Sequence, residues 1–362
     1  MKFNFKRTSH QAGFTLIEIM IGLVIGMLVA LVITQVLSMF EGQKRATTGT
    51  ADAQTNGSIA LYNIERELQL AGYPLMPSGV AVTADSPIEC TTVKNAATNA
   101  DISISPVTIT DGVAGTNPAS DTITLRYGTS LSGGVPSIIG AVVGNVVTVG
   151  SNFGCQFGDI TLVNSGTNCA LSSATAVTGT TAPMSVTLGN TMFAAPGANL
   201  ACLGQWLTVT YAVNPTTGNL ERTAAGVVTP VVAGVVNLQA QYGVSASANS
   251  NQVVQWVNAT SGGTWDAPTA PTRNLIKAIR IAVITRNTKI EPNVVTTACS
   301  SITAATPTGL CAWDATSANP SVASPAPLVD LSPGNANWNR YHYRVFETII
   351  PLRNMIWSKD TL

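Results

Sequence analysis

An uncharged run at residues 19–40 constrains the fold of this chain more than any other feature of its sequence. The run is 22 residues long, and its only polar side chains are Thr34, Gln35 and Ser38. As a helix it would span roughly 33 Å at 1.5 Å per residue, which is enough to cross a hydrocarbon core about 30 Å thick. The sequence therefore predicts a transmembrane helix at about residues 19–40.

The residues that flank the run predict its orientation. Lys2, Lys6 and Arg7 precede it, and no acid occurs before Gly13. By the positive-inside rule, the N-terminus lies in the cytoplasm and the rest of the chain lies across the membrane. A plain signal peptide or signal anchor is the competing interpretation. A secretory signal, however, ends its apolar core in a small-residue cleavage site, and no such site follows here promptly.

A carboxylate, Glu18, stands at the start of the apolar run. Such an acid costs a few kcal/mol in a membrane helix and usually has a partner. The segment Gly13-Phe-Thr-Leu-Ile-Glu18, which follows a short basic leader and precedes an unbroken apolar helix, resembles a type IV prepilin. The resemblance implies that residues 1–13 are a leader, that a prepilin peptidase cuts between Gly13 and Phe14, and that the new amine of Phe14 is methylated. It also implies that Glu18 pairs with the N-terminal amine of a neighbouring subunit during assembly, a contact that selects axial register more than it adds stability.

The helix is expected to continue to residue 72, beyond the membrane. One face is apolar at helical spacing, and polar residues that include Glu65 and Glu67 take the solvent side; the apolar residues are Leu61, Ile64, Leu68 and Ala71. Residues 47–58 are poor in helix formers, so a bend or local melting is expected there. Gly72, followed by Tyr73-Pro74, is a stop signal.

Beyond Pro74 the pattern changes to strands. Strands are expected at residues 121–127, 206–213, 220–222, 235–244, 253–257, 278–286 and 343–350. Stretches rich in Thr, Ser, Gly, Asn and Ala predict loops or insertions at about residues 91–120, 163–200 and 298–335. The predicted fold class is α+β and pilin-like, with the long helix packed on a largely antiparallel β-sheet head with large loops. The head is residues 73–362, with a loop-rich insertion at about residues 78–202.

Four further segments resemble the PilW-type minor pilin family: residues 66–73, 232–243, 276–287 and 343–354. The resemblance implies other minor pilins, the major pilin, the prepilin peptidase and a tip adhesin as partners. It also implies a single-pass inner-membrane protein with a periplasmic head, which later joins a pilus on the cell surface.

Composition and motifs exclude several classes of function. Eighteen Lys plus Arg balance eighteen Asp plus Glu, and charged residues are only 10% of the 362, so no basic surface for nucleic acid is expected. Four cations from residue 277 to 289 are expected on an exposed strand face. The sequence holds two histidines, His10 and His342, and none of the common hydrolase, zinc-protease, phosphate-loop or dinucleotide motifs. We expect no catalytic residue, no metal and no cofactor.

Six cysteines follow the apolar run, which places them in an oxidising compartment and predicts disulfides. Their sequence positions allow 15 connectivities. Short loops favour the pairs Cys155–Cys169 and Cys299–Cys311, which leaves Cys90–Cys202 as the third pair.

Taken together, these resemblances imply a minor pilin that initiates and assembles the type IV pilus and supports twitching motility and attachment. A head of 290 residues has an expected radius of gyration of about 19 Å, against about 13 Å for a 100-residue domain. Repeated along a shaft, such heads would clash, so a position at the tip is expected. Two alternatives stay open: an adhesin module that binds a surface or host ligand through its central loops, and a pseudopilin of type II secretion.

Overall fold

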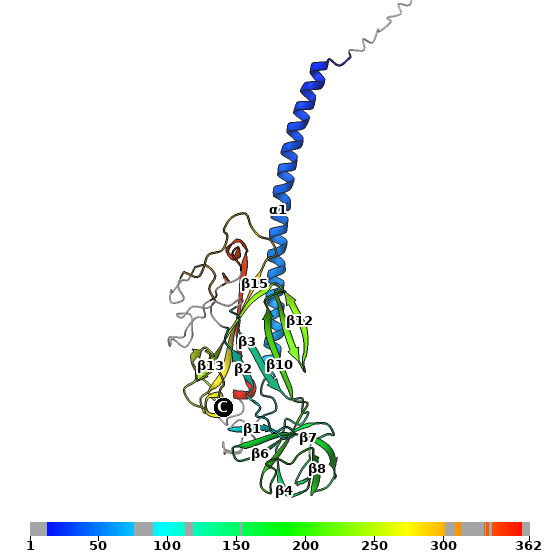
Figure 1. The fold of residues 1–362 in the computed structure, drawn as a ribbon, viewed down its shortest axis with the longest axis vertical. Helices are drawn as coiled ribbons and strands as arrows, with labels where there is room; N and C mark the ends of the chain where they lie inside the picture. The colour runs from blue at the N-terminus through cyan, green and yellow to red at the C-terminus, as the bar shows by residue number, and fades with distance from the viewer. Residues whose placement is uncertain are drawn as a thin grey trace, which may run out of the picture. The chain divides into compact units, whose positions relative to one another are not determined.

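The computed structural model describes residues 13–75, 90–112, 119–152, 154–300, 308–312, 329, 331–332 and 335–356. It divides the chain between Gly49 and Thr50 into two compact units, each of which is described by itself below. The first unit contains most of helix α1 (Leu16–Leu68), and the second contains the end of that helix and every strand (Figure 1).

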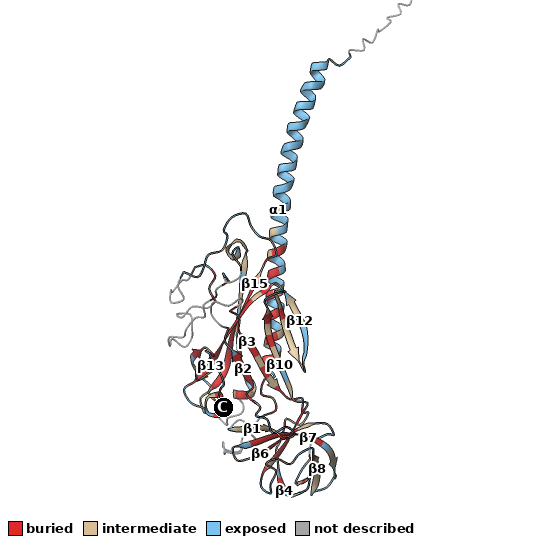
Figure 2. Cartoon of the chain, viewed as in Figure 1, coloured by how far each residue is buried: buried red, intermediate tan, exposed pale blue. Residues whose placement is uncertain are grey.

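Residues 19–40 of α1, which lie in the first unit, are apolar around the whole circumference of the helix. Their side chains are exposed on every face (Figure 2), as the exposed fractions of 60% for Leu28 and 55% for Ile25 illustrate. Within the described residues, α1 is the one helix long and apolar enough to cross a membrane. An all-round apolar surface is stable only when lipid or other helices cover it. The helix is continuous through residues 47–58, so the expected local melting does not occur, and turns connect Leu68 to Pro74.

In the second unit, α1 buries a stripe of small and then larger side chains. Ala53, Gly57, Ala60, Ile64 and Leu68 recur every three or four residues and are all buried. At Gly57 the sheet approaches so closely that an added Cβ would lie 2.1 Å from Cε2 of Phe346. This stripe joins the largest hydrophobic core of the chain.

Two antiparallel sheets share that core. Five strands pair in the order β12-β11-β10-β3-β2, and four pair in the order β14-β13-β15-β16. Their bounds are β2 (Val107–Thr110), β3 (Thr122–Tyr127), β10 (Leu207–Asn214), β11 (Asn219–Ala224), β12 (Val227–Ala233), β13 (Val235–Ser245), β14 (Val253–Val257), β15 (Ile276–Arg286) and β16 (Tyr343–Pro351). The seven strands expected from periodicity are all present. Short helices α2 (Ala270–Arg273), η2 (Trp338–Arg340) and α3 (Arg353–Ile356) complete this part.

The central segment folds into a β-barrel, which corrects the expectation of a loop at residues 163–200, and the expected loop at residues 91–120 contains two short strands outside the barrel, β1 (Thr92–Asn95) and β2. Strands β7, β6, β9, β4, β5 and β8 pair in that order, and β8 pairs back with β7, so the ring closes. All of these pairings are antiparallel; β1 joins β7 from outside in parallel register. The bounds are β1 (Thr92–Asn95), β4 (Ser137–Val143), β5 (Val146–Val149), β6 (Ile160–Ser165), β7 (Asn168–Thr178), β8 (Met184–Leu188) and β9 (Asn199–Gly204). Most of the third expected loop, at residues 298–335, lies outside the described residues.

The barrel is an insertion between two neighbouring strands. Tyr127 at the end of β3 is the register partner of Leu207 at the start of β10, and the barrel strands β4 to β9 lie between them in sequence. The barrel also has a hydrophobic core of its own, which includes Ile139, Val163 and Leu188. It is therefore a module built into a hairpin of the five-stranded sheet.

Asp121, just before β3, is a buried carboxylate that connects the two sheets. Its oxygens accept hydrogen bonds from the backbone N–H of Gly112 (2.9 Å) and of Ala240 in β13 (2.7 Å). Burial nevertheless raises the pKa of Asp121 from 3.8 to about 7, because two backbone donors do not replace the lost hydration and the charge of Asp111 adds to the penalty.

We expect this carboxylate to make the free energy of unfolding depend on pH. Between about pH 4 and 7 the folded state keeps a proton on Asp121 that the unfolded state has released, so stability falls as the pH rises through this range, by on the order of 3 kcal/mol. Urea unfolding of the full chain in detergent at pH 5 and pH 7.5 measures this loss. Asp121→Asn should remove this dependence of the unfolding free energy on pH. Asp101→Asn, at an exposed carboxylate, should keep it. If the unfolding free energy of Asp121→Asn depended on pH as strongly as that of the wild type, Asp121 would not be the source of this dependence.

Candidate functional site

The N-terminal residues singled out by the sequence form a helix cap. The backbone N–H and the hydroxyl of Thr15 each donate to Oε2 of Glu18 at 2.9 Å, and the N–H of Glu18 donates back to the Thr15 hydroxyl at 3.3 Å. This reciprocal pattern is a capping box, which satisfies backbone donors that a helix start leaves unpaired. Sequence reasoning missed it, although the spacing Thr15-Leu-Ile-Glu18 carries its signature.

The cap leaves the proposed processing site open. Phe14 is 84% exposed, and among the described residues, which begin at Gly13, no atom lies within 4 Å of the position where a Cβ on Gly13 would stand. Oε1 of Glu18 takes part in none of these three hydrogen bonds. One carboxylate oxygen thus holds the helix start, and the other has acceptor capacity for a further donor.

A second polar cluster connects α1 to the five-stranded sheet. Arg222 on β11 donates to both oxygens of Glu67, through Nη2 to Oε1 at 2.8 Å and through Nε to Oε1 at 3.0 Å and Oε2 at 3.2 Å. The hydroxyl of Tyr211 on β10 donates to Oε2 at 2.8 Å. The expectation that Glu67 faces solvent is therefore wrong, because an arginine distant in sequence pairs with it. Burial and the neighbouring carboxylate raise the pKa of Tyr211, and the hydrogen bonds to Glu67 raise that of Arg222.

Removing this pair should loosen the end of α1 from the sheet. We expect Glu67→Gln to lower the free energy of unfolding by about 2 kcal/mol, because Arg222 loses its charged partner, although its side chain is 30% exposed and regains some hydration. Urea unfolding followed by tryptophan fluorescence measures the change. The matched control is Asp101→Asn, which removes an exposed partner of Lys94 and should cost at most about 0.5 kcal/mol. Equal effects of the two variants would refute the role of Glu67.

Two of the four cations at residues 277–289 are not on an exposed strand face as expected, whereas Arg286 and Lys289 are half-buried. Lys277 and Arg280 are 1% and 3% exposed on β15, because that strand lies between β13 and β16. Lys277 donates to the carbonyl of Ala248 at 3.1 Å, and Arg280 donates to Gln241 at 2.6 Å with its guanidinium 5.0 Å from the Trp256 ring centroid. Burial lowers the pKa of Arg280 to about 9. These two cations therefore belong to the core of the second unit.

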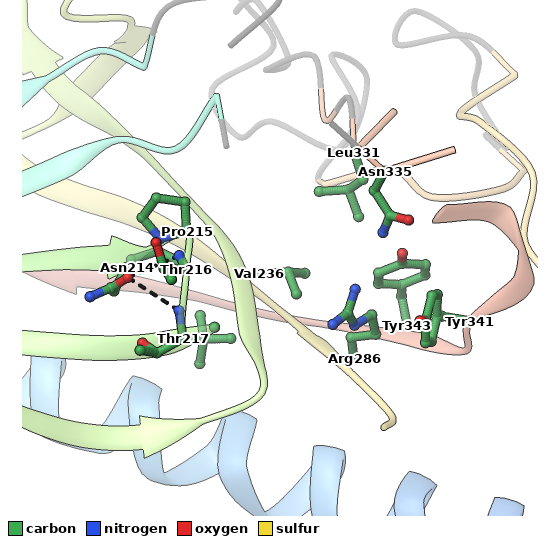
Figure 3. A pocket seen from close by; sticks show the side chains of 13 residues that line it. Asn214, Pro215, Thr216, Thr217, Val236, Arg286, Leu331, Asn335, Tyr341 and Tyr343 are labelled. Atoms are coloured by element: carbon green, nitrogen blue, oxygen red, sulfur yellow. Dashed lines mark hydrogen bonds between the residues drawn. The ribbon is translucent and has the colours of Figure 1, made fainter. Parts of the chain in front are cut away.

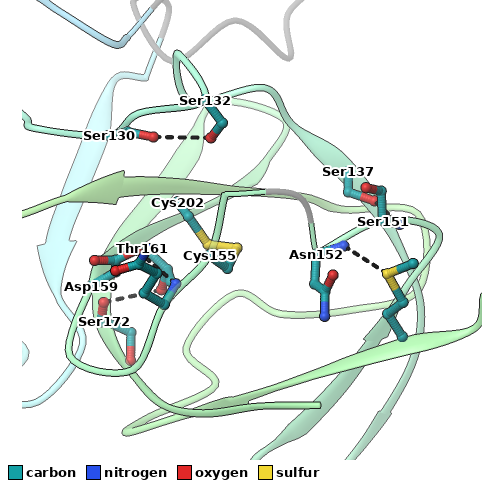
Figure 4. The surroundings of a disulfide bond; sticks show 12 residues. Ser130, Ser132, Ser137, Ser151, Asn152, Cys155, Asp159, Thr161, Ser172 and Cys202 are labelled. Carbon is teal, nitrogen blue, oxygen red and sulfur yellow. Dashed lines mark hydrogen bonds between the residues drawn. A yellow bond between two sulfur atoms is a disulfide. The ribbon is translucent and has the colours of Figure 1, made fainter. Parts of the chain in front are cut away.

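The disulfides differ in part from the pairing expected. Cys299–Cys311 is present, but the expected Cys155–Cys169 and Cys90–Cys202 pairs are wrong: Cys90 bonds to Cys169 and Cys155 to Cys202. The loop-length argument failed because the parallel pairing of β1 with β7 brings Cys90 beside Cys169. Figure 4 shows Cys155, in the segment before β6, joined to Cys202 on β9 inside the barrel module.

A polar cavity of about 310 Å³ lies beside the turn between β10 and β11 (Figure 3). The side-chain oxygen of Asn214 accepts hydrogen bonds from the N–H groups of Thr216 and Thr217 and so shapes that turn. Across the cavity, the guanidinium of Arg286 lies 4.3 Å from the Tyr341 ring centroid. The lining holds no carboxylate and no imidazole, and within the described part of the chain no group of three His, Cys, Asp or Glu residues could hold a metal. This arrangement offers hydrogen bonds and a stacked cation.

Comparison with family models gives two matches, one at each end of the chain. Residues 8–34 match the prokaryotic N-terminal methylation motif, and residues 207–354 match the family described as Type IV Pilus-assembly protein W. The second match begins where the inserted barrel ends and covers the strands from β10 to β16. Comparison with curated proteins and with solved structures gives no significant match. The chain thus combines the N-terminal methylation motif of a type IV prepilin with a C-terminal region similar to the PilW pilus-assembly proteins, and both resemblances noted in its sequence are confirmed.

Proposed function

We propose that this protein is a minor pilin that initiates and assembles the type IV pilus. The observation that carries the proposal is the presence in one chain of a prepilin methylation motif and a PilW-like region. The apolar part of α1 would hold the subunit in the inner membrane, with its head in the periplasm, and would then pack among the helices of the filament. Twitching motility and attachment would follow from the filament, and the partners would be other minor pilins, the major pilin, the prepilin peptidase and a tip adhesin.

A deletion strain tests this function against the pseudopilin alternative. Sheared pili and secreted proteins are quantified in the wild type, the deletion strain and a complemented strain. Loss of pili with normal secretion, restored by complementation, is the expected result. Loss of secretion with normal pili would overturn the proposal in favour of a type II secretion pseudopilin.

The size of the head supports a position at the filament tip. The second unit contains two packed sheets and an inserted barrel, and a body of this size at every site of a helical shaft would collide with its neighbours. At the tip no subunit lies above it. Gold-labelled antibody against the head should decorate filament ends in a few copies. Regular decoration along whole shafts would rule this position out.

A second candidate function, a pilus-borne adhesin, is favoured by the inserted barrel. The barrel has its own hydrophobic core and precedes the region that matches the pilus-assembly family. In this function the barrel would contact a surface or a host ligand. Binding by the purified chain without other pilins is the expected result, and failure to bind any surface or glycan tested would count against it.

A further inference from the structure

A cavity of about 540 Å³ lies where the barrel meets the five-stranded sheet. Its lining comes from both parts, with Ile160 and Ser173 on the barrel strands β6 and β7, and Arg126 and Thr208 on the sheet strands β3 and β10. The volume is within the range of roughly 300–1,000 Å³ that is usual for small-ligand sites. The junction between the inserted module and its host sheet therefore forms a site of ligand size.

Arg126 supplies a positive charge that no carboxylate in the described part of the chain neutralises. Its Nη1 donates to the carbonyl of Ser105 at 3.0 Å and to the hydroxyl of Thr108 at 2.9 Å. These two bonds fix the guanidinium and use both hydrogens of Nη1, which leaves the donors on Nε and Nη2. Burial lowers the pKa of Arg126, yet an arginine remains charged in proteins. A half-buried, uncompensated guanidinium on a cavity wall is suited to an anionic group, with two parallel hydrogen bonds to a carboxylate.

The rest of the lining combines an aromatic ring with small hydroxyls. Trp206, directly before β10, is half-buried and lines the cavity on the side of the five-stranded sheet. Leu171 on β7 contributes an apolar side chain to the lining. Ser172 and Ser173 present hydroxyls beside it; the Ser172 hydroxyl accepts from the N–H of Asn190 at 3.0 Å and still has its own proton to donate. Figure 4 shows Ser172 on the barrel near the Cys155–Cys202 disulfide. An indole suits the C–H face of a sugar ring, and hydroxyls that donate and accept suit its hydroxyl groups.

We propose that this cavity binds an acidic saccharide, with its carboxylate on Arg126 and its ring against Trp206. The inference rests on the second of the two functions proposed above and names its ligand class. It is tested on purified protein, so its failure is distinguishable from a failure of pilus assembly.

The experiment titrates the purified full chain in detergent with glucuronic acid and N-acetylneuraminic acid, followed by saturation-transfer NMR and calorimetry. Glucose and acetate are the matched probes, since glucose lacks the carboxylate and acetate lacks the ring. The variants are Arg126→Gln and Ser173→Tyr, which fills the cavity from β7. The control is Thr175→Tyr, two residues along the same strand, exposed and outside the cavity lining.

Saturable binding of at least one acidic sugar, at least about tenfold tighter than glucose or acetate, is the expected result, because a charge-assisted pair contributes about this much. Arg126→Gln and Ser173→Tyr should each weaken it about tenfold or more, and Thr175→Tyr should leave it unchanged. Because Ser173 is exposed, Ser173→Tyr keeps the test valid if Arg126→Gln fails to fold. No saturable binding, equal binding of glucose or acetate, or wild-type affinity in Ser173→Tyr would each overturn the proposal.

Discussion

Gly13→Leu is expected to leave the chain as an unprocessed precursor and to remove it from the pilus. A prepilin peptidase requires a small residue before the cut, which the resemblance at Gly13 and Phe14 implies. A leucine side chain there would block the cut, so the basic leader would stay attached, and its charges would prevent the apolar helix from entering the filament core. We therefore expect nearly all of the Gly13→Leu protein to be present as precursor, whereas the wild-type protein is present in its mature form.

Mass spectrometry of the N-terminal peptide measures this result. The wild-type protein should begin at N-methylated Phe14, and Gly13→Leu should begin at or near Met1. Gly13→Ala, which keeps a small residue, should be processed like the wild type. A wild-type N-terminus at Met1, or one beyond residue 30, would contradict the prepilin interpretation.

Glu18→Gln should insert into the membrane normally and yet fail to assemble. Removing the charge makes insertion more favourable, and glutamine still accepts the hydrogen bonds of the capping box with Thr15. The variant therefore keeps the helix start and loses only the negative charge proposed to pair with the Phe14 amine of a neighbour. We expect at least about a tenfold loss of this protein from sheared pili at equal amounts in the membrane, the effect of losing a charged pair.

Thr15→Ala is the matched control for this experiment. It removes the hydroxyl that takes part in two of the three capping contacts with Glu18, at a cost of about 1 kcal/mol of helix stability, and it keeps the carboxylate. Immunoblots of sheared pili and membranes should show near-normal incorporation of Thr15→Ala. If Glu18→Gln assembles normally, the carboxylate has no role in register. If both variants fail equally, assembly requires the cap as well as the charge of the carboxylate.

The sequence predicted the helix and seven of the strands because their patterns are local. In β3, the alternation of Ile123, Leu125 and Tyr127 reports one buried face. The longest barrel strand, β7, carries a weaker signal, because most of its residues are Ser, Thr and Ala. A strand of this composition resembles a loop when only its sequence is considered. The burial of Lys277 and Arg280 was also not predicted, because strand β15 is buried on both faces and its sequence therefore shows no alternation between a buried and an exposed face.

The polar contacts of the site were less predictable, because they depend on pairings that are remote in sequence. Glu67 and Arg222 are 155 residues apart, and no local pattern connects them. The Cys90–Cys169 bond closes a separation of 79 residues and depends on a parallel strand pairing that no turn signal indicates. By contrast, the capping box at Thr15 and Glu18 was readable, because both members lie within one helical turn.

The disulfide between Cys90 and Cys169 has a mechanical consequence for a barrel inserted in a hairpin. Without this disulfide, the barrel would be connected to the rest of the chain only through the end of β3 and the start of β10. A force on the barrel would then act on these two strands and separate their hydrogen-bonded pairs one after another. Cys169 lies in the barrel, and Cys90 lies just ahead of β1, so the bond adds a third covalent connection to the chain. Tension on the barrel is then divided among three covalent connections, so less of it acts on the hydrogen-bonded pairs of β3 and β10.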